Sequence, residues 1–513
     1  MEKEASIPEP VKLSGSSLWL AAIMLALGNF VAVLDMTITN VAVPTIAGSL
    51  GISTSQGTWI ITSYAVAEAV SVPLTGWLSQ RFGSVRVFTT AMLMFGLTSL
   101  ICGISTTFPA LLLGRILQGL SGGPMMPLAQ TLLMRIFPKE KIGAAMGLWA
   151  MTTLVAPVAG PILGGFLCEY YKWEYAFLIN VPIAIACSII VYPLLRSQET
   201  PIEKKSVDFI GLGLMVLWIA ALQIMLDEGK DKDWFASEEI RNLAMVAIVG
   251  FFAFIIWELT EKNPIVDLRV FRHRGYVASV TTLVVAFGAF FGINVLNPLW
   301  LQGYMNYTST WSGMATAWTG ALAIFMAPLV GAFGDRFDPR KLVFIGVSWL
   351  GFIALVRSFG TTDMTYWNVA FPLFIMGVGM PLFFVPLSSM ALRSVEPSEA
   401  ESAAGLMAFL RTLAGAFATS TVTTIWDNKI KENYANLAGS VDATGELARN
   451  ITASGGSKLD IASNYSQNLM PQAVMLATNE TFMLLAVITF CAACMVFFVP
   501  KPSKDGGPVP MAH

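Results

Sequence analysis

Long apolar stretches separated by short polar connectors dominate the pattern of this chain. From Leu18 almost to the C-terminus, the runs reach roughly 20 residues, the length a helix needs to cross a hydrocarbon core of about 30 Å. Membrane-spanning strands would alternate apolar and polar residues over about ten positions, so the pattern predicts helices. We expect fourteen spans, at residues 17–44, 57–78, 86–106, 108–134, 143–168, 175–195, 209–226, 240–257, 276–301, 311–333, 342–359, 367–391, 402–425 and 481–499.

The composition agrees with a chain that lies in a lipid bilayer. Hydrophobic residues make up 55% of the 513 positions and charged residues only 12%, whereas a soluble domain usually carries about 25% charged residues. The fold class expected is therefore an all-α polytopic membrane protein. The net charge of −2 includes no basic stripe, so no nucleic-acid partner is expected.

The distribution of basic residues predicts how the chain is oriented. Connectors that share a face with the two termini carry 20 Lys and Arg, against 7 on the opposite face. The positive-inside rule therefore places both termini in the cytoplasm. The polar segment 426–480 is expected to be a loop on the outer face, and a disordered connector and a partner-docking loop fit its composition equally well.

Two connectors resemble each other and indicate a duplicated architecture. Residues 76–86, GWLSQRFGSVR, and residues 331–341, GAFGDRFDPRK, share a Gly, an Arg-Phe pair and trailing basic residues. Such repeats are typical of transporters built from parallel halves. The loop-motif residues are Gly76, Arg81, Gly83, Arg86, Asp335, Arg336 and Arg340. We expect tails at 1–16 and 500–513, six-helix bundles at 17–195 and 276–499, and between them a segment, 196–275, with two extra helices (209–226, 240–257).

Residues that would carry enzyme chemistry are scarce. The two histidines, His273 and His513, give neither a metal cluster nor a catalytic base, and no phosphate-binding GxxxxGK[ST] loop occurs. We expect no enzyme activity, no metal and no cofactor. The five cysteines lie in or beside apolar runs and are interpreted as packing residues: Cys102, Cys168, Cys187, Cys491 and Cys494.

Ionisable residues inside the spans are the main candidates for function. Asp35 lies about midway through the first span, where an ionised carboxylate costs at least about 2.5 kcal/mol and requires a partner. Arg115 in the fourth span is the expected partner, with Gln118 one turn further on the same face. The pair would serve proton coupling at a central cavity, or alternatively form a structural ion pair.

Further polar residues in the spans are assigned to the same cavity. Glu68 would carry a proton or recognise a cation, or else stay neutral and hydrogen-bonded. Arg411 would hold an anionic substrate or an acidic partner, or be structural, and Asn294 is a further cavity candidate. In the fifth span, residues 156–165, APVAGPILGG, predict a hinge or a seal, because prolines and glycines loosen the helical hydrogen-bond ladder and permit close packing.

Together these motifs resemble the major facilitator superfamily over essentially the whole chain. GWLSQRFGSVR resembles its cytoplasmic loop motif, the Arg115 stretch its fourth-span motif, and APVAGPILGG the antiporter motif of drug:proton exchangers. The stretches LDMTITNVAVPTIAG, QGTWIITSYAVA, INVPIA, LQIMLDEGKDKDWF and WELTEKNPIVDL make the chain similar to the fourteen-span EmrB-like subgroup. In the loop motif, Gln80 replaces the usual Asp.

The resemblance implies a proton-driven exporter of small amphipathic toxic compounds in a bacterial inner membrane. Asp35 and Arg115 would then take proton-coupling roles. The resemblance also implies a periplasmic adaptor of the EmrA type and a TolC-like outer-membrane channel as partners. The alternative is a proton-coupled symporter for an organic solute. The antiporter-helix role would belong to Pro157, Gly160, Pro161, Gly164 and Gly165.

Overall fold

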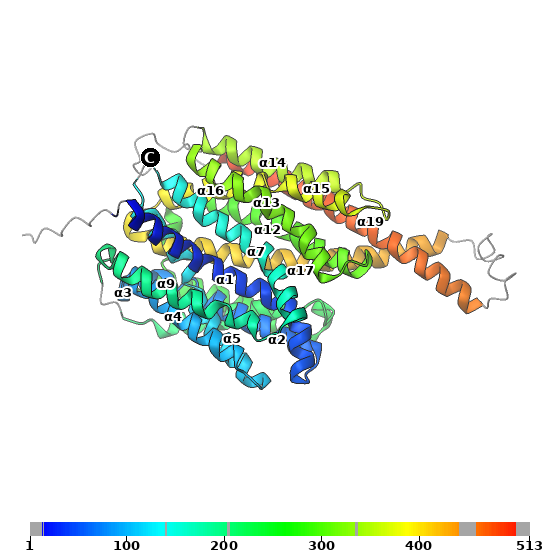
Figure 1. Ribbon diagram of the computed structural model, residues 1–513, viewed down its shortest axis with the longest axis horizontal. Helices are drawn as coiled ribbons and strands as arrows, with labels where there is room; N and C mark the ends of the chain where they lie inside the picture. Colours follow the sequence, from blue (N-terminus) through cyan, green and yellow to red (C-terminus); the bar gives the residue numbers. More distant parts are fainter. Residues whose placement is uncertain are drawn as a thin grey trace, which may run out of the picture.

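The computed structural model describes residues 13, 15–138, 141–202, 206–333, 337–440 and 458–498, and every regular element among them is a helix (Figure 1). A chain in a bilayer satisfies its backbone polar groups in this way, because no water is present to do so. Within these ranges, twelve helical stretches are long and apolar enough to cross a membrane. The long helices run side by side along the long axis of the molecule.

Most helices of the N-terminal half lie in the lower part of Figure 1, and α7 crosses the middle of the molecule. Helix α1 packs against α7 and α9, α4 against α5 and α9, and α2 against α5. The bounds of these helices are α1 (Gly15–Leu50), α2 (Thr54–Ser71), α3 (Thr75–Phe82), α4 (Ser84–Gly103), α5 (Phe108–Gly122), α6 (Met125–Ile136), α7 (Ile142–Tyr170), α8 (Tyr175–Leu178) and α9 (Asn180–Leu195).

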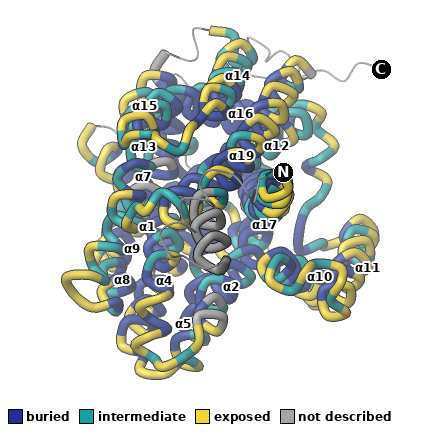
Figure 2. Tube along the Cα trace, turned by 90° about the vertical axis from the view of Figure 1, so that its right-hand side faces the viewer, coloured by how far each residue is buried: buried dark blue, intermediate teal, exposed yellow. Residues whose placement is uncertain are grey.

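Two helices follow that belong to neither half. Helices α10 (Phe209–Glu228) and α11 (Glu238–Thr260) pack on each other as a hairpin. Helix α10 also contacts α2 and α17, and Figure 2 shows the hairpin at the edge of the molecule beside these two helices. We call this pair the inserted hairpin.

Most helices of the C-terminal half lie in the upper part of Figure 1, and α17 runs through the middle. Helix α14 packs against α16 and α19, and α12 packs against α17 and α19. Helix α13 lies along α7 and joins the two halves, and one buried apolar core contains residues of both. The bounds are α12 (Arg274–Tyr304), α13 (Ser309–Phe333), α14 (Pro339–Arg357), α15 (Tyr366–Met376), α16 (Gly379–Arg393), α17 (Ala400–Ser440) and α19 (Lys458–Met495).

Two of the predicted spans are interrupted helices rather than continuous ones. The span expected at 57–78 breaks between α2 and α3, next to Pro73, and the span expected at 108–134 breaks between α5 and α6 at Gly123 and Pro124. Proline removes a backbone donor, so a turn at these points is the expected consequence. These two interrupted spans are the ones absent from the twelve long apolar helices, so the total of fourteen spans stays a prediction.

The expectation of a loop at 426–480 is wrong for most of its described residues. Helix α17 continues to Ser440 and α19 begins at Lys458, and Figure 1 shows both helices extending beyond the other helices. The two extensions contact each other: the indole of Trp426 donates to the Thr478 hydroxyl at 3.0 Å, and Lys429 pairs with Glu480 at 3.4 Å. Apolar character ends near residue 425, but Ala, Lys, Glu and Gln continue a helix readily in water.

Candidate functional site

The carboxylate of Asp35 is the centre of a buried polar cluster between α1, α5 and α9. Its Oδ2 accepts a hydrogen bond from Nη1 of Arg115 at 2.6 Å. Its Oδ1 accepts from Nε2 of Gln118 at 2.9 Å and from Nδ2 of Asn180 at 2.6 Å. Burial of an unpaired charge between apolar helices is costly, so the three donors are what make the burial of this carboxylate possible.

Arg115 is held in place by several further contacts. Its Nε donates to the carbonyl of Ile60 at 3.1 Å, and Nη1 also donates to the side-chain oxygen of Gln118 at 2.7 Å. The guanidinium lies 4.2 Å from the ring centroid of Tyr64, an arrangement that stabilises a desolvated cation. The predicted pairing of Asp35 with Arg115 is thus present, and α2 contributes to it.

Both charged side chains are sealed from solvent in this conformation. Asp35 and Gln118 are 0% exposed and Arg115 is 1% exposed. In this conformation Asp35 and Gln118 are enclosed within the N-terminal half, so their role at a central cavity stays a prediction. Asn180 was missed from the sequence, since an uncharged amide at the start of an apolar run gives no signal of its own.

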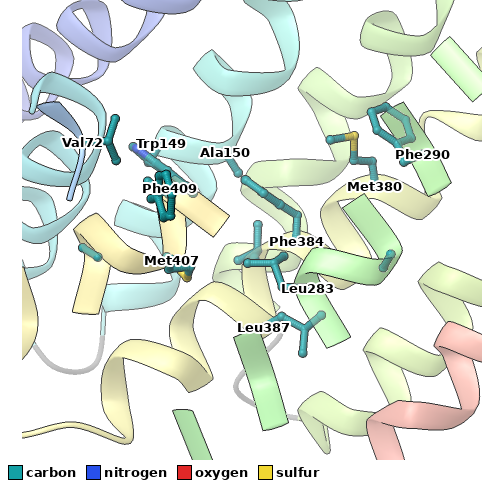
Figure 3. Packing of buried hydrophobic residues seen from close by; sticks show 14 of the residues in the cluster. Val72, Trp149, Ala150, Leu283, Phe290, Met380, Phe384, Leu387, Met407 and Phe409 are labelled. Carbon is teal, nitrogen blue, oxygen red and sulfur yellow. The ribbon is translucent and has the colours of Figure 1, made fainter. Parts of the chain in front are cut away.

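Arg411 lies at the interface between the two halves, in an aromatic setting. Its guanidinium is 3% exposed and 5.4–5.6 Å from the ring centroids of Trp149, Phe287 and Phe384. Figure 3 shows Trp149 of α7 and Phe384 of α16 among the buried apolar residues, and their rings stack with centroids 5.3 Å apart. Arg411 also contacts the sulfur of Met126, and its Nη1 has no hydrogen-bond partner among the described residues.

The other two cavity candidates differ in their surroundings. Glu68 is partly buried on α2, and its carboxylate interacts electrostatically with both Arg115 and Arg411. Asn294 is partly buried and donates to the carbonyl of Phe290 at 2.8 Å. Its neighbour Asn297 is fully buried, and within the described part of the chain its side-chain amide has no partner. Glu68 and Arg411 thus link the Asp35 cluster electrostatically to the interface between the halves.

The predicted antiporter segment is a continuous part of α7, which runs through Pro157 and Pro161 without a break. Gly160 and Gly164 bring α7 against α1. A Cβ atom added at Gly160 would lie 2.6 Å from Cβ of Thr37, and one at Gly164 would lie 3.0 Å from the carbonyl oxygen of Ile38. The glycines therefore fix α7 against the part of α1 that carries Asp35. Gly165 is more open, with its nearest neighbour, Thr310, 3.8 Å away.

The first loop motif forms a network at the end of the bundle where α4 begins. Gly83, which precedes α4, has a φ of 89°. In the first turn of α4, the backbone N–H of Val85 donates to one carboxylate oxygen of Glu199 at 2.8 Å, and that of Arg86 donates to the other at 3.0 Å. A carboxylate at a helix N-terminus is favourable electrostatically. Arg81 packs on the ring of Trp77 at 5.4 Å.

The two halves are tied together at this same end, which we call the loop-motif end. Arg135 of α6 forms an ion pair with Glu401 of α17, and a Cβ at Gly76 would collide with the Ser402 side chain. Sequence reasoning did not identify Arg135 or Glu401, because both lie near polar connectors where charges are common.

The repeat of the loop motif is only partly visible. Asp335 and Arg336 lie outside the described residues. Asp338 caps α14 by accepting from the backbone N–H of Arg340 at 3.0 Å. The pKa of the Asp338 carboxyl is lowered from its ordinary value, because partial burial, which raises it, is outweighed by the hydrogen bonds and charge of Arg340.

Helices α7 and α13 pack most tightly at the loop-motif end. A Cβ at Gly331 would lie 2.1 Å from the carbonyl oxygen of Gly143, and one at Gly147 would lie 2.7 Å from that of Ala327. Near the opposite end, a Cβ at Gly313 has its nearest contact at 3.6 Å, with Pro161. The structure is therefore closed at the loop-motif end and packed less tightly at the other.

One group of side chains has the composition of a metal site but is engaged in ion pairs. His273, Glu396 and Glu399 lie close together near the start of α12. The guanidinium of Arg272 pairs with Glu396 at 3.1 Å and with Glu399 at 2.9 Å, and the His273 ring contacts Glu399 at 2.7 Å. A cation would compete with Arg272 for the same carboxylates, so the ion pairs account for this group.

These features define the chain as a polytopic helical membrane protein of the transporter type, with a charged cluster sealed between spans and two halves joined along paired helices. The family model of the Major Facilitator Superfamily matches residues 25–419, and the chain belongs to this family. In solved structures, the proton:xylose symporter XylE aligns with a TM-score of 0.60 at 14% identity, covering 95% of this chain and 96% of that one. That likeness concerns the fold alone.

Curated relatives match along nearly the full length. The chain is 39% identical over 506 residues to the multidrug export protein EmrB of Escherichia coli (strain K12), covering 98% of this chain and 99% of the relative. It is 40% identical over 502 residues to the fatty acid resistance protein FarB of Neisseria gonorrhoeae, covering 96% and 98%. The resemblance seen in the sequence, to an EmrB-like member of this family, is confirmed.

Proposed function

We propose that the chain exports hydrophobic and amphipathic toxic compounds across the bacterial inner membrane in exchange for protons. The names of its relatives, a multidrug export protein and a fatty acid resistance protein, support the export of such compounds. The observation that carries the proton-driven part is the Asp35 carboxylate, buried in the membrane and held by Arg115, Gln118 and Asn180. An ionisable residue at that depth is a functional site by default.

Proton transfer at Asp35 would act on the packing of α1. Protonation of its carboxylate removes the negative partner of Arg115, and the cost of leaving one charge of a buried pair alone is about 3–5 kcal/mol. That cost favours a conformation in which Arg115 finds another partner or water. Glu68 is a candidate partner, since its charge interacts with that of Arg115.

The energy available is sufficient for export. One charge moved through the membrane potential supplies about 2.3 kcal/mol per 100 mV. About 1.4 kcal/mol corresponds to a tenfold concentration ratio, so one inward proton supports a gradient of more than tenfold for an uncharged compound. The proton gradient is the only energy source that this mechanism requires.

Alternating access would open the two ends of the bundle in turn. With both termini in the cytoplasm, as the basic residues indicate, the loop-motif end is the cytoplasmic end. The conformation described here is then closed toward the cytoplasm by the Arg135–Glu401 ion pair and by the contact of Gly331 with Gly143. Opening at that end requires both contacts to separate.

The paired extensions of α17 and α19 are the proposed docking site for a periplasmic adaptor of the EmrA type, which would lead to a TolC-like channel. In the same orientation they project from the outer face, and they are polar and long. Co-purification of the full chain with a co-expressed adaptor, with and without residues 427–478, tests this. Loss of the adaptor on deletion is expected, and unchanged co-purification would exclude the docking role.

Accumulation of a hydrophobic weak acid in cells that lack their own exporters tests the export proposal. Cells expressing the chain should hold less of the compound than cells with the vector, and a protonophore should abolish the difference. A proton-coupled symporter, the alternative function, would instead raise the cellular level of its solute. An unchanged level for a broad panel of hydrophobic compounds would refute export.

A further inference from the structure

A second cavity lies outside the charged cluster, between the inserted hairpin and α17. Its volume is about 390 Å³, within the range of about 300–1,000 Å³ that is typical of small-molecule pockets. Helices α10 and α11 form one side of it and α17 the other. Phe271 of the connector after α11 and Pro73, at the break between α2 and α3, also line it.

The lining of this cavity excludes charged ligands and favours rings. Every lining side chain is apolar, and seven of them are aromatic. Trp218 of α10 packs edge-on against Phe251 of α11 at 5.1 Å and against Phe409 of α17 at 5.9 Å, which leaves ring faces and edges for a flat ligand. A lipid tail would need no such rings, since aliphatic side chains pack against it equally well.

The rim of the cavity faces the region that lipid tails occupy. Ile248 and Phe252 of α11 are 58% and 60% exposed, and Phe417 of α17 is 43% exposed. All three lie within apolar spans, so their exposed surfaces contact hydrocarbon once the chain is in a membrane. A compound dissolved in the bilayer reaches this cavity without passing through water.

The cavity is separated from the interface between the halves by the thickness of one helix. Leu410 and Leu413 of α17 line the cavity, whereas Arg411 between them contacts Trp149 and Phe384 at the interface. A ligand in the cavity would therefore contact the helix that carries Arg411.

We propose that this cavity binds uncharged, ring-bearing hydrophobic compounds, which enter from the bilayer between α11 and α17. It is distinct from the Asp35 cluster. In the exporter proposed above it would be the site at which membrane-dissolved compounds are first captured. Only this last role rests on the proposed function, whereas binding itself does not.

Photolabelling with benzophenone tests the binding site, because this neutral ketone carries two aromatic rings. The full chain in phosphatidylcholine nanodiscs is irradiated with the probe, and labelled peptides are located by mass spectrometry. Labels are expected on residues that line the cavity, with Met215 of α10 as a reactive example. Fluorenone, a second neutral ring ketone, should displace the label, and hexadecane should not.

Two matched variants on α11 make the result specific. Ala247 lines the cavity and is 5% exposed, so Ala247→Trp fills it and should lower labelling at least about tenfold, the factor that 1.4 kcal/mol represents. Val249 is 62% exposed and lies outside the lining, so Val249→Trp should leave labelling unchanged.

Each contrary outcome has a definite meaning. Labels spread evenly along the lipid-facing side of α11, or equal loss in Ala247→Trp and Val249→Trp, would overturn the proposal. Displacement by hexadecane as readily as by fluorenone would show a site for lipid tails instead. If the chain labels as expected but exports no compound, the exporter proposal is refuted and the binding site is supported. If export is normal but labelling is unspecific, the binding site is refuted and the exporter proposal is supported.

Discussion

Replacement of Gly331 by alanine should shift the chain away from the conformation described here. Gly331 of α13 contacts α7, and an added Cβ would lie 2.1 Å from the carbonyl oxygen and 2.9 Å from the carbonyl carbon of Gly143. Both are backbone atoms, so no side chain can rotate aside. The two helices must separate by about 1 Å or more at this point, because a Cβ atom essentially never approaches another heavy atom closer than 3.0 Å.

The cost of that separation determines the expected size of the shift. An extra methyl group in a well-packed interface costs typically about 1–3 kcal/mol. The clash exists only while the loop-motif end is closed, so the closed state alone is destabilised. The ratio of open to closed molecules should then rise by a factor of about 5 to 150.

Gly313→Ala is the matched control. Gly313 lies on the same helix and faces the same partner helix, α7. A Cβ added there would lie 3.6 Å from its nearest neighbour, Cβ of Pro161, which is an ordinary packing distance. Both substitutions raise the intrinsic helix propensity of α13 by the same amount, up to about 1 kcal/mol, so this contribution cancels in the comparison.

Distances between spin labels at positions 86 on α4 and 341 on α14 measure the opening. Both residues are exposed near the loop-motif end, one in each half. In a chain whose native cysteines are replaced by serine, Gly331→Ala should add or enlarge a longer-distance population, and Gly313→Ala should not. Identical distributions for the two variants, or no change for Gly331→Ala, would refute the reasoning.

Three further predictions follow from single contacts. Glu401→Gln removes the partly buried ion pair between the halves and should enlarge the same longer-distance population, whereas an unchanged distribution would contradict a gating role. Asn180→Leu removes one donor to the Asp35 carboxylate, which is worth about 1.5–3 kcal/mol, and should lower the thermal unfolding midpoint measured in detergent. Trp426→Phe keeps the ring but loses the bond to Thr478, so the α17–α19 extension should become more susceptible to limited proteolysis while export continues.

Features that depend on the cost of burying charge were predictable from the sequence. Asp35 and Arg115 stand in apolar spans 80 positions apart, and each requires a partner, so their pairing follows without knowledge of the fold. The glycines of α7 were predictable in the same sense, since small residues in a span mark close helix contacts. The structure adds that their contact is with α1, which sequence alone does not specify.

Contacts made by polar residues whose sequence context is unremarkable were not predictable. Asn180 and Glu199 act only because distant segments bring a carboxylate or a free helix N-terminus to them, and neither residue type is unusual where it stands. The extension of α17 was missed for a different reason, because the hydropathy that defines a span ends near residue 425 whereas helix propensity does not. Nor does the sequence show which conformation the chain adopts, so it does not predict that the Asp35 cluster is enclosed here.

Substrate-induced proton movement in proteoliposomes is the most direct test of the central claim, that Asp35 couples protons to export. The vesicles carry an imposed pH gradient, and a hydrophobic weak acid or cation is added to wild type and to Asp35→Asn, in which the amide keeps the shape but not the charge. If the account is correct, the compound dissipates the gradient with wild type and has no effect with Asp35→Asn. Equal dissipation by both would show that Asp35 is structural and that protons are coupled elsewhere.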